Sequence, residues 1–143
     1  WSSDVCSSDL YLPVFEAACP GERRLAETVA ACEAYGKGQT SLNELKSLLR
    51  EAAQVARALA DRPVAQAAAR AVSVACSTVQ TPTNALGYLF YGAAAIAYSQ
   101  AGLDRTAEEY EELAAVEFQR AYASLQKACI PDEPHPAKLH WNC

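Results

Sequence analysis

The 143-residue sequence has little positive charge. It contains 12 Lys and Arg against 17 Asp and Glu, which gives a formal net charge of −5. A protein that binds nucleic acid needs clustered basic side chains to neutralise the phosphates. The composition therefore excludes a nucleic-acid partner, and a mildly acidic surface is better suited to a basic protein partner.

Long apolar runs are also lacking. The clearest apolar run, residues 85–98, is too short to cross a membrane, and Gly87 and Gly92 interrupt it. The sequence therefore predicts a core helix at this position and no membrane span.

Catalytic and cofactor-binding motifs are missing as well. His135 and His140 are the only histidines, and no serine occupies the G-x-S-x-G turn of a nucleophile elbow. The segment Gly36-Lys37-Gly38 lacks the spacing of a phosphate-binding loop and no strand precedes it. The sequence predicts a protein that is not an enzyme, has no cofactor and acts by binding.

The pattern that is present is helical. Much of the hydrophobic content is alanine, which favours helices that pack closely. Ser41 and Glu44 have the spacing of a capping box, and no charged residue occurs between Arg70 and Asp104. We predict an all-α fold, a single compact bundle of about five antiparallel helices, with its third and fourth helices as the buried centre. These helices cover about residues 22–35, 41–60, 63–79, 84–100 and 104–128.

Both ends of the chain differ from this pattern. Residues 1–10, WSSDVCSSDL, resemble the conceptual translation of a common sequencing-adapter primer. We predict that they are a non-native segment outside the fold that adds nothing to stability. Residues 11–129 form the predicted helical bundle domain. Residues 130–143 contain three prolines within six residues, which predicts an extended tail.

A metal site is the weaker of two hypotheses for the tail. Thiolate and imidazole groups suit zinc, but the arrangement C-x5-H-x4-H-x2-C fits no standard zinc spacing. The odd number of cysteines outside residues 1–10 and the lack of a CxxC motif favour reduced thiols. We therefore favour a tail packed over the bundle, with Trp141 as its anchor. The residues of the metal alternative are Cys129, His135, His140 and Cys143.

An acidic run stands near the start of the fifth predicted helix. Its members are Glu108, Glu109, Glu111 and Glu112. Acids at this position favour the positive end of the helix dipole and a solvated helix face. The same carboxylates also make a candidate contact for a basic partner, because charge complementarity speeds association.

Glu117 is the most unusual single residue of the chain. At about 100° per residue it lies on the apolar stripe of its helix, with Tyr110 and Ala121. We predict a buried carboxylate that hydrogen bonds or ion pairs stabilise. A catalytic acid would need a second titratable group nearby, and the sequence identifies none.

Two stretches resemble the helical immunity protein family of bacterial polymorphic toxin systems. Residues 19–45, CPGERRLAETVAACEAYGKGQTSLNEL, have its charged opening helix, Gly-containing turn and capped second helix. Residues 74–97, VACSTVQTPTNALGYLFYGAAAIA, have a helix, a short turn and the N/H-A-x-G start of an Ala/Tyr-rich helix. Residues 117–119 resemble a late acid-aromatic-Gln element. The chain departs from the pattern at Ser77, Thr78 and Asn84, where the family has histidines.

The resemblance implies a bacterial, cytoplasmic antidote that binds and blocks a cognate protein toxin by occlusion. The alternative from another class is a helical module for a small ligand or a metal. The tail residues, or a pocket around Tyr88, Tyr91 and Tyr98, would serve that alternative. The sequence indicates neither the toxin nor the oligomeric state.

Overall fold

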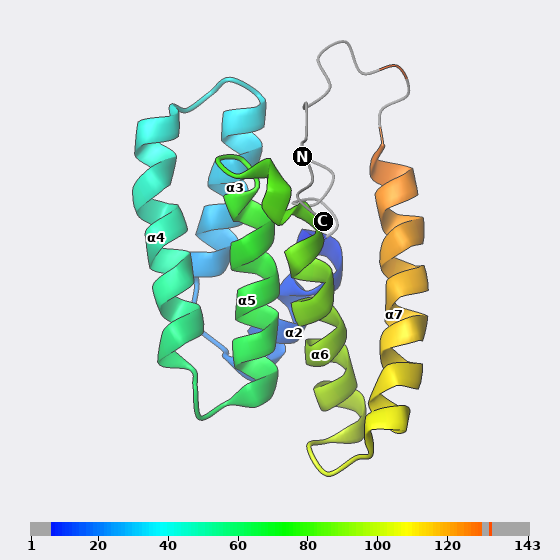
Figure 1. Cartoon of the computed structure of the whole chain (residues 1–143). Coiled ribbons are helices and arrows are strands. Elements are labelled where there is room, and N and C mark those ends of the chain that lie inside the picture. Colours follow the sequence, from blue (N-terminus) through cyan, green and yellow to red (C-terminus); the bar gives the residue numbers. More distant parts are fainter. Residues whose placement is uncertain (1–6, 130–131, 133–143) are drawn as a thin grey trace.

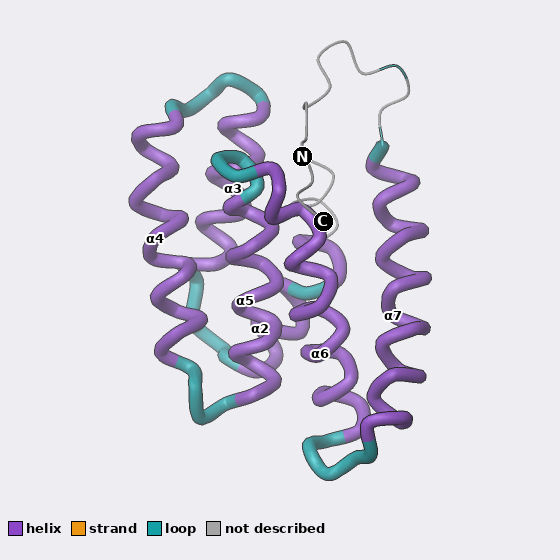
Figure 2. The backbone as a smooth tube through the Cα atoms, viewed as in Figure 1, coloured by secondary structure: helices purple, strands orange, loops and turns teal. Residues whose placement is uncertain are grey.

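The computed structural model describes residues 7–129 and residue 132, and all of its regular structure is helical (Figures 1 and 2). The predicted all-α class is confirmed, although six α-helices rather than five are present in the described part of the chain. Short loops join them, so neighbours along the chain are mostly antiparallel. The elements are α2 (Leu12–Ala18), α3 (Arg24–Gly36), α4 (Leu42–Ala58), α5 (Pro63–Ser77), the 3₁₀ helix η1 (Pro82–Leu86), α6 (Gly87–Ala101) and α7 (Ala107–Ala128).

Helix α5 is the centre of the bundle. It packs against α2, α3, α4 and α6, whereas α7 lies at the edge and packs against α6 (Figure 1). Nine of the 15 residues of α5 are buried, and six of these nine are alanines. Because alanine has no side chain beyond Cβ, the neighbouring helices can approach α5 closely from several sides. No helix in the described part of the chain is long and apolar enough to cross a membrane.

Two capping boxes fix the starts of long helices. The Ser41 hydroxyl accepts the Glu44 backbone N–H, and the Glu44 carboxylate accepts the Ser41 N–H at 2.8 Å, as the spacing predicts. Thr106 and Glu109 form the second box, which the sequence analysis missed. Helix α7 therefore begins at Ala107 rather than near residue 104. The sequence predicts that the fourth α-helix starts near residue 84. This prediction is wrong, because residue 84 lies in the 3₁₀ helix η1 and the α-helix α6 begins only at Gly87.

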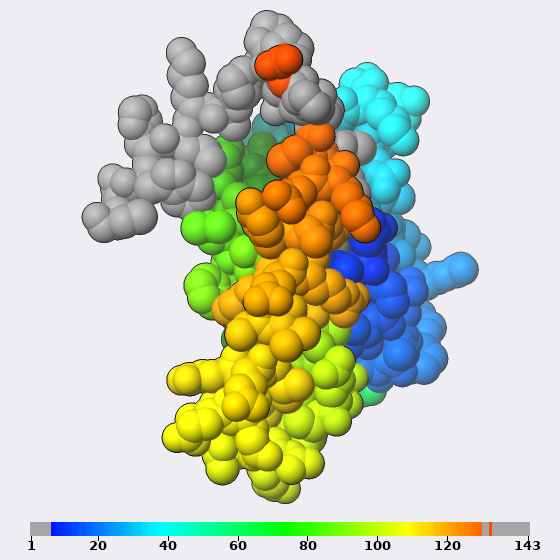
Figure 3. Space-filling view, turned by 90° about the vertical axis from the view of Figure 1, so that its right-hand side faces the viewer, coloured from blue at the N-terminus to red at the C-terminus, as the bar shows by residue number. Residues whose placement is uncertain are grey.

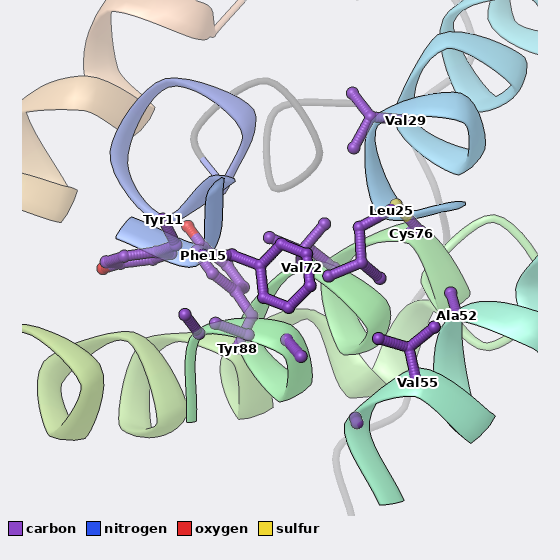
Figure 4. Packing of buried hydrophobic residues seen from close by; sticks show 14 of the residues in the cluster. Tyr11, Phe15, Leu25, Val29, Ala52, Val55, Val72, Cys76 and Tyr88 are labelled. Carbon is purple, nitrogen blue, oxygen red and sulfur yellow. The ribbon is translucent and has the colours of Figure 1, made fainter. Parts of the chain in front are cut away.

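Helix α2 was not predicted, yet this helix and the residue before it supply two of the three largest fully buried side chains. Tyr11 precedes this helix and Phe15 lies within it, and both are fully buried. Figure 4 shows them meeting Tyr88 and Val72, from α6 and α5, and the Tyr11 and Tyr88 rings lie 6.1 Å apart. The signal in the sequence was the four-residue spacing of Tyr11, Phe15 and Cys19, which places all three on one helical face.

Residues 7–10 differ from the prediction that residues 1–10 lie outside the fold. They are helical, Ser7 is fully buried and Leu10 packs against the core. The Tyr11 N–H donates to the Ser7 carbonyl at 2.9 Å, so the helical backbone continues across this boundary. The adapter origin of residues 1–10 stays a prediction.

The predicted extended tail, residues 130–143, lies outside the described residues except for Asp132. Its conformation and its contacts with the bundle therefore stay predictions.

Gly92 should not tolerate a larger side chain. A Cβ atom at this position would overlap the Tyr11 ring, whereas at Gly87 it would lie 3.2 Å from Val74 Cγ1. We expect Gly92→Ala to cost about 1–3 kcal/mol, as overpacking does, and to lower Tm by several degrees. Thermal melts followed by circular dichroism measure this effect. Gly87→Ala, the matched control, should change Tm much less. If Tyr11→Leu does not reduce the cost of Gly92→Ala, the proposed steric cause is wrong.

Backbone amides of α5 should exchange with solvent most slowly. The buried surface of α5 contacts four other helices, so its amides open only when much of the bundle opens. Helix α6 is the one helix with which α7 makes extensive contact in the described part of the chain. Only two residues of α7, Glu117 and Ala121, are buried. Hydrogen exchange followed by mass spectrometry should therefore show α7 exchanging well before α5. Equal protection of the two helices would contradict this architecture.

Candidate functional site

Helix α6 is only partly covered, which differs from the predicted buried centre. Ala93, Ala95, Ile96 and Ala97 are buried in its second half. In its first turns, however, Phe90 is 66% exposed, and Leu86 just before the helix is also exposed. A helix that is apolar on all sides needs a neighbour on every side, and α6 has one only along part of its length.

An exposed aromatic patch results where α6 and α7 meet. The rings of Phe90 and Phe118 lie 5.8 Å apart, edge to face, and connect the two helices. Tyr122 follows Phe118 by four residues, so it shares this face of α7, and Leu86, the last residue of η1, precedes Phe90 by four; both are exposed. Figure 3 shows α7, yellow to orange, crossing this side of the molecule, with the green start of α6 beside it. We call the exposed residues Leu86, Phe90, Phe118 and Tyr122 the aromatic patch.

A groove between α6 and α7 continues from this patch. Its volume is about 270 Å³ and its lining is mostly alanine and aromatic side chains. The Phe90–Phe118 pair lines one part, and a second edge-to-face pair, Tyr98 and Tyr110, lies 5.6 Å apart in another. The Tyr110 hydroxyl donates to the Gly102 carbonyl at 2.9 Å, which fixes this ring beside the α6–α7 turn. The lining residues are Phe90, Ala93, Ala94, Ala97, Tyr98, Tyr110, Glu111, Ala114 and Phe118.

The structure divides the acidic run at the start of α7 into two parts. Glu109 belongs to the capping box, and its carboxylate accepts the Thr106 N–H at 2.9 Å and Arg105 Nη1 at 3.3 Å. The Thr106 backbone N–H, followed by the charge of Arg105, lowers the pKa of Glu109. The pKa of Glu108 is also lowered, first by its own backbone N–H and then by the Thr106 hydroxyl. Glu109 therefore stabilises the helix start and is a poor candidate for a partner contact.

Glu111 is the acid that reaches the groove. It lines the groove, and it lies about 20° around α7 from Phe118. Glu108 is about 60° from Glu111 on the helical wheel and Glu112 about 100°, so both lie farther from the groove. The candidate contact is thus the Glu111 edge of the groove, with Glu108 next to it.

Glu117 is buried on the inner face of α7, with 2% of its surface exposed. Arg120 donates to its Oε2 atom at 3.3 Å, while Oε1 has no hydrogen bond of standard geometry within the described residues. Burial raises the pKa of Glu117, although the Arg120 charge and the Tyr11 hydroxyl act in the opposite direction. The groups that act on this carboxylate are thus Arg120 of the same helix and Tyr11, and no cluster of His, Cys, Asp or Glu that could hold a metal ion occurs in the described part of the chain.

The three tyrosines of the ligand alternative do not gather at one place. Tyr88 is fully buried, Arg70 lies over the Tyr91 ring at 5.5 Å, and Tyr98 alone of the three lines the groove. Cys129 is an exposed thiol. The other members of the metal set, His135, His140 and Cys143, lie outside the described residues.

Comparison with known proteins gives one match. The family model described as "Imm-5 like putative immunity protein" matches residues 1–123. This range includes every element from α2 to α6, both members of the Phe90–Phe118 pair and the acidic run. No curated protein and no solved structure matches the chain.

Replacing Glu117 with glutamine should have an effect that depends on pH. Because the folded state raises the pKa of Glu117 above its ordinary 4.5, the folded protein holds this proton more tightly than the unfolded chain. Stability from this group is therefore lost as pH rises through the raised pKa. Glutamine cannot ionise, so the Tm of Glu117→Gln relative to wild type should rise between about pH 4 and pH 8.

Thermal melts over this pH range measure the difference. Glu112→Gln, which removes an exposed carboxylate from the same helix, is the control and should show a much weaker pH trend. A Tm difference for Glu117→Gln that stays constant with pH would contradict a raised pKa.

Proposed function

The chain belongs to the Imm-5 like putative immunity protein family, and we propose that it binds a cognate protein toxin and blocks it by occlusion. On this proposal the protein acts in the cytoplasm of a bacterial cell that carries the toxin, and it protects that cell without modifying the toxin chemically. Occlusion requires only a surface that complements the toxin, so no catalytic side chain is needed.

The exposed aromatic patch is the observation that carries this proposal. Soluble proteins that do not bind partners rarely expose contiguous aromatic surface, because its exposure to water is unfavourable. Aromatic residues are enriched at the centres of protein interfaces, where they provide much of the binding free energy. At its centre the Phe90–Phe118 pair joins two helices, so these two exposed rings form one surface and are not scattered single residues.

A small-ligand module is the second candidate, because the groove beside the patch could hold a ligand. Pockets for drug-sized molecules are typically about 300–1,000 Å³ and enclose most of the ligand. The groove, at about 270 Å³, lies just below that range. A groove of this size also accepts one or two side chains of a protein partner.

Co-expression with toxins tests the proposal directly. The chain is produced in a bacterial host together with toxin domains encoded next to its gene, and survival is scored against a host that has the toxin alone. We expect survival to rise by several orders of magnitude for one toxin, and the two purified proteins to form a stable complex. The toxin recovered from that complex should keep its mass and regain its activity on dissociation. A chemically altered toxin would show that the chain is an enzyme.

If no neighbouring toxin is neutralised and a metabolite stays bound through purification, the small-ligand module is the better interpretation. Mass spectrometry of the purified protein under native conditions detects such a molecule.

A further inference from the structure

We propose that the α6–α7 groove and the aromatic patch form the docking site for a basic, amphipathic segment of the toxin. One bulky apolar side chain of that segment enters the groove, and a Lys or Arg beside it faces Glu111. This inference rests on the proposed function, because it names the surface that would carry out the occlusion.

The shape and lining of the groove determine the first requirement. A volume of about 270 Å³ between mostly apolar side chains accepts a large aliphatic or aromatic side chain. Phe90 and Phe118 stand at the groove with substantial exposed surface, 66% and 37%, respectively. A partner that covers them removes apolar area from water, which is the main favourable contribution to association.

The charge at the groove determines the second requirement. Glu111 lines the groove, and within the described residues it forms no ion pair, in contrast to Glu109, which pairs with Arg105. A carboxylate beside an apolar groove would be partly desolvated by an apolar partner, which is unfavourable unless the partner supplies a cation. A basic residue adjacent to the apolar anchor meets this need.

A second copy of the chain is a poorer occupant. The formal net charge is −5, so two copies repel each other, and each brings the same acidic edge to the interface. Complementarity instead favours a partner of opposite charge.

Two fluorescent peptides probe this surface without knowledge of the toxin. Both are amphipathic helices of about 18 residues, or about five turns, with the same leucine and tryptophan face. One has lysine on its polar face and the other has glutamate. By fluorescence anisotropy at low salt, the lysine peptide should bind the full chain at least about tenfold more tightly than the glutamate peptide, and added salt should weaken it.

Matched variants locate the binding. One variant combines Phe90→Ser with Phe118→Ser, and a second has Glu111→Lys alone. We expect each variant to bind the lysine peptide about tenfold more weakly than wild type. Val116→Ser is the control for the apolar change, because Val116 is 67% exposed but lies about 160° around α7 from Phe118. Glu27→Lys is the control for the charge change, because Glu27 is exposed on α3, which packs against α4 and α5. Circular dichroism checks that every variant is folded, and both controls should bind as wild type does.

Each result decides for or against this surface. Equal binding of the two peptides, or equal loss in the control and groove variants, would overturn the inference. If sedimentation shows that the wild-type chain is a dimer and that the double variant, Phe90→Ser with Phe118→Ser, is a monomer, a second copy is the occupant of the groove. This result would also overturn the inference. If the groove variants still protect cells fully against a neutralised toxin, the inference fails and the proposed function stands. If peptide binding depends on the groove but the chain protects against no toxin, the groove stands as a binding surface for a basic amphipathic segment and the proposed function fails.

Discussion

The contact between the Tyr11 ring and the backbone of Gly92 is the constraint on which the bundle depends. Only a residue without Cβ lets the ring lie at this point of α6. With Tyr11 in place, α2 lies against α5 and α6, and Phe15 fills the space beside Val72. The hydroxyl of the same tyrosine also acts on Glu117 of α7, where it lowers the pKa of the buried carboxyl. One aromatic side chain just before α2 thus acts on residues of both α6 and α7.

Helix α6 has more apolar surface than the neighbouring helices cover. Its residues are apolar around the whole helix, which would suit a helix enclosed by neighbours. Helices α5 and α7 pack against it and Tyr88 in its first turn is fully buried, but Phe90, and Leu86 just before the helix, face water. The part of an aromatic surface that stays exposed to water lowers solubility, and that part does not stabilise the fold. A binding surface explains why a small domain would have it.

Charge on α7 serves two purposes within a few residues. Glu109 fixes the helix start through Thr106 and Arg105, while Glu111 lies at the groove. Glu117 is the opposite case, a carboxylate held in the interior at some cost in stability. Neighbouring acids of one helix thus differ in purpose because each points in a different direction, which follows from the helical rotation of about 100° per residue.

The sequence by itself determined the all-α class, most helix boundaries and the Ser41–Glu44 capping box, because these depend on contacts within a few residues. The burial of Glu117 also follows from its position on one helical stripe. The tertiary structure alone decided the rest. Helix α2 is short, and Tyr11 just before it matters through distant residues, among them Gly92, 81 positions away in the numbering. The groove and the aromatic patch exist only because α7 covers part of α6, and no local pattern encodes how far one helix extends along another.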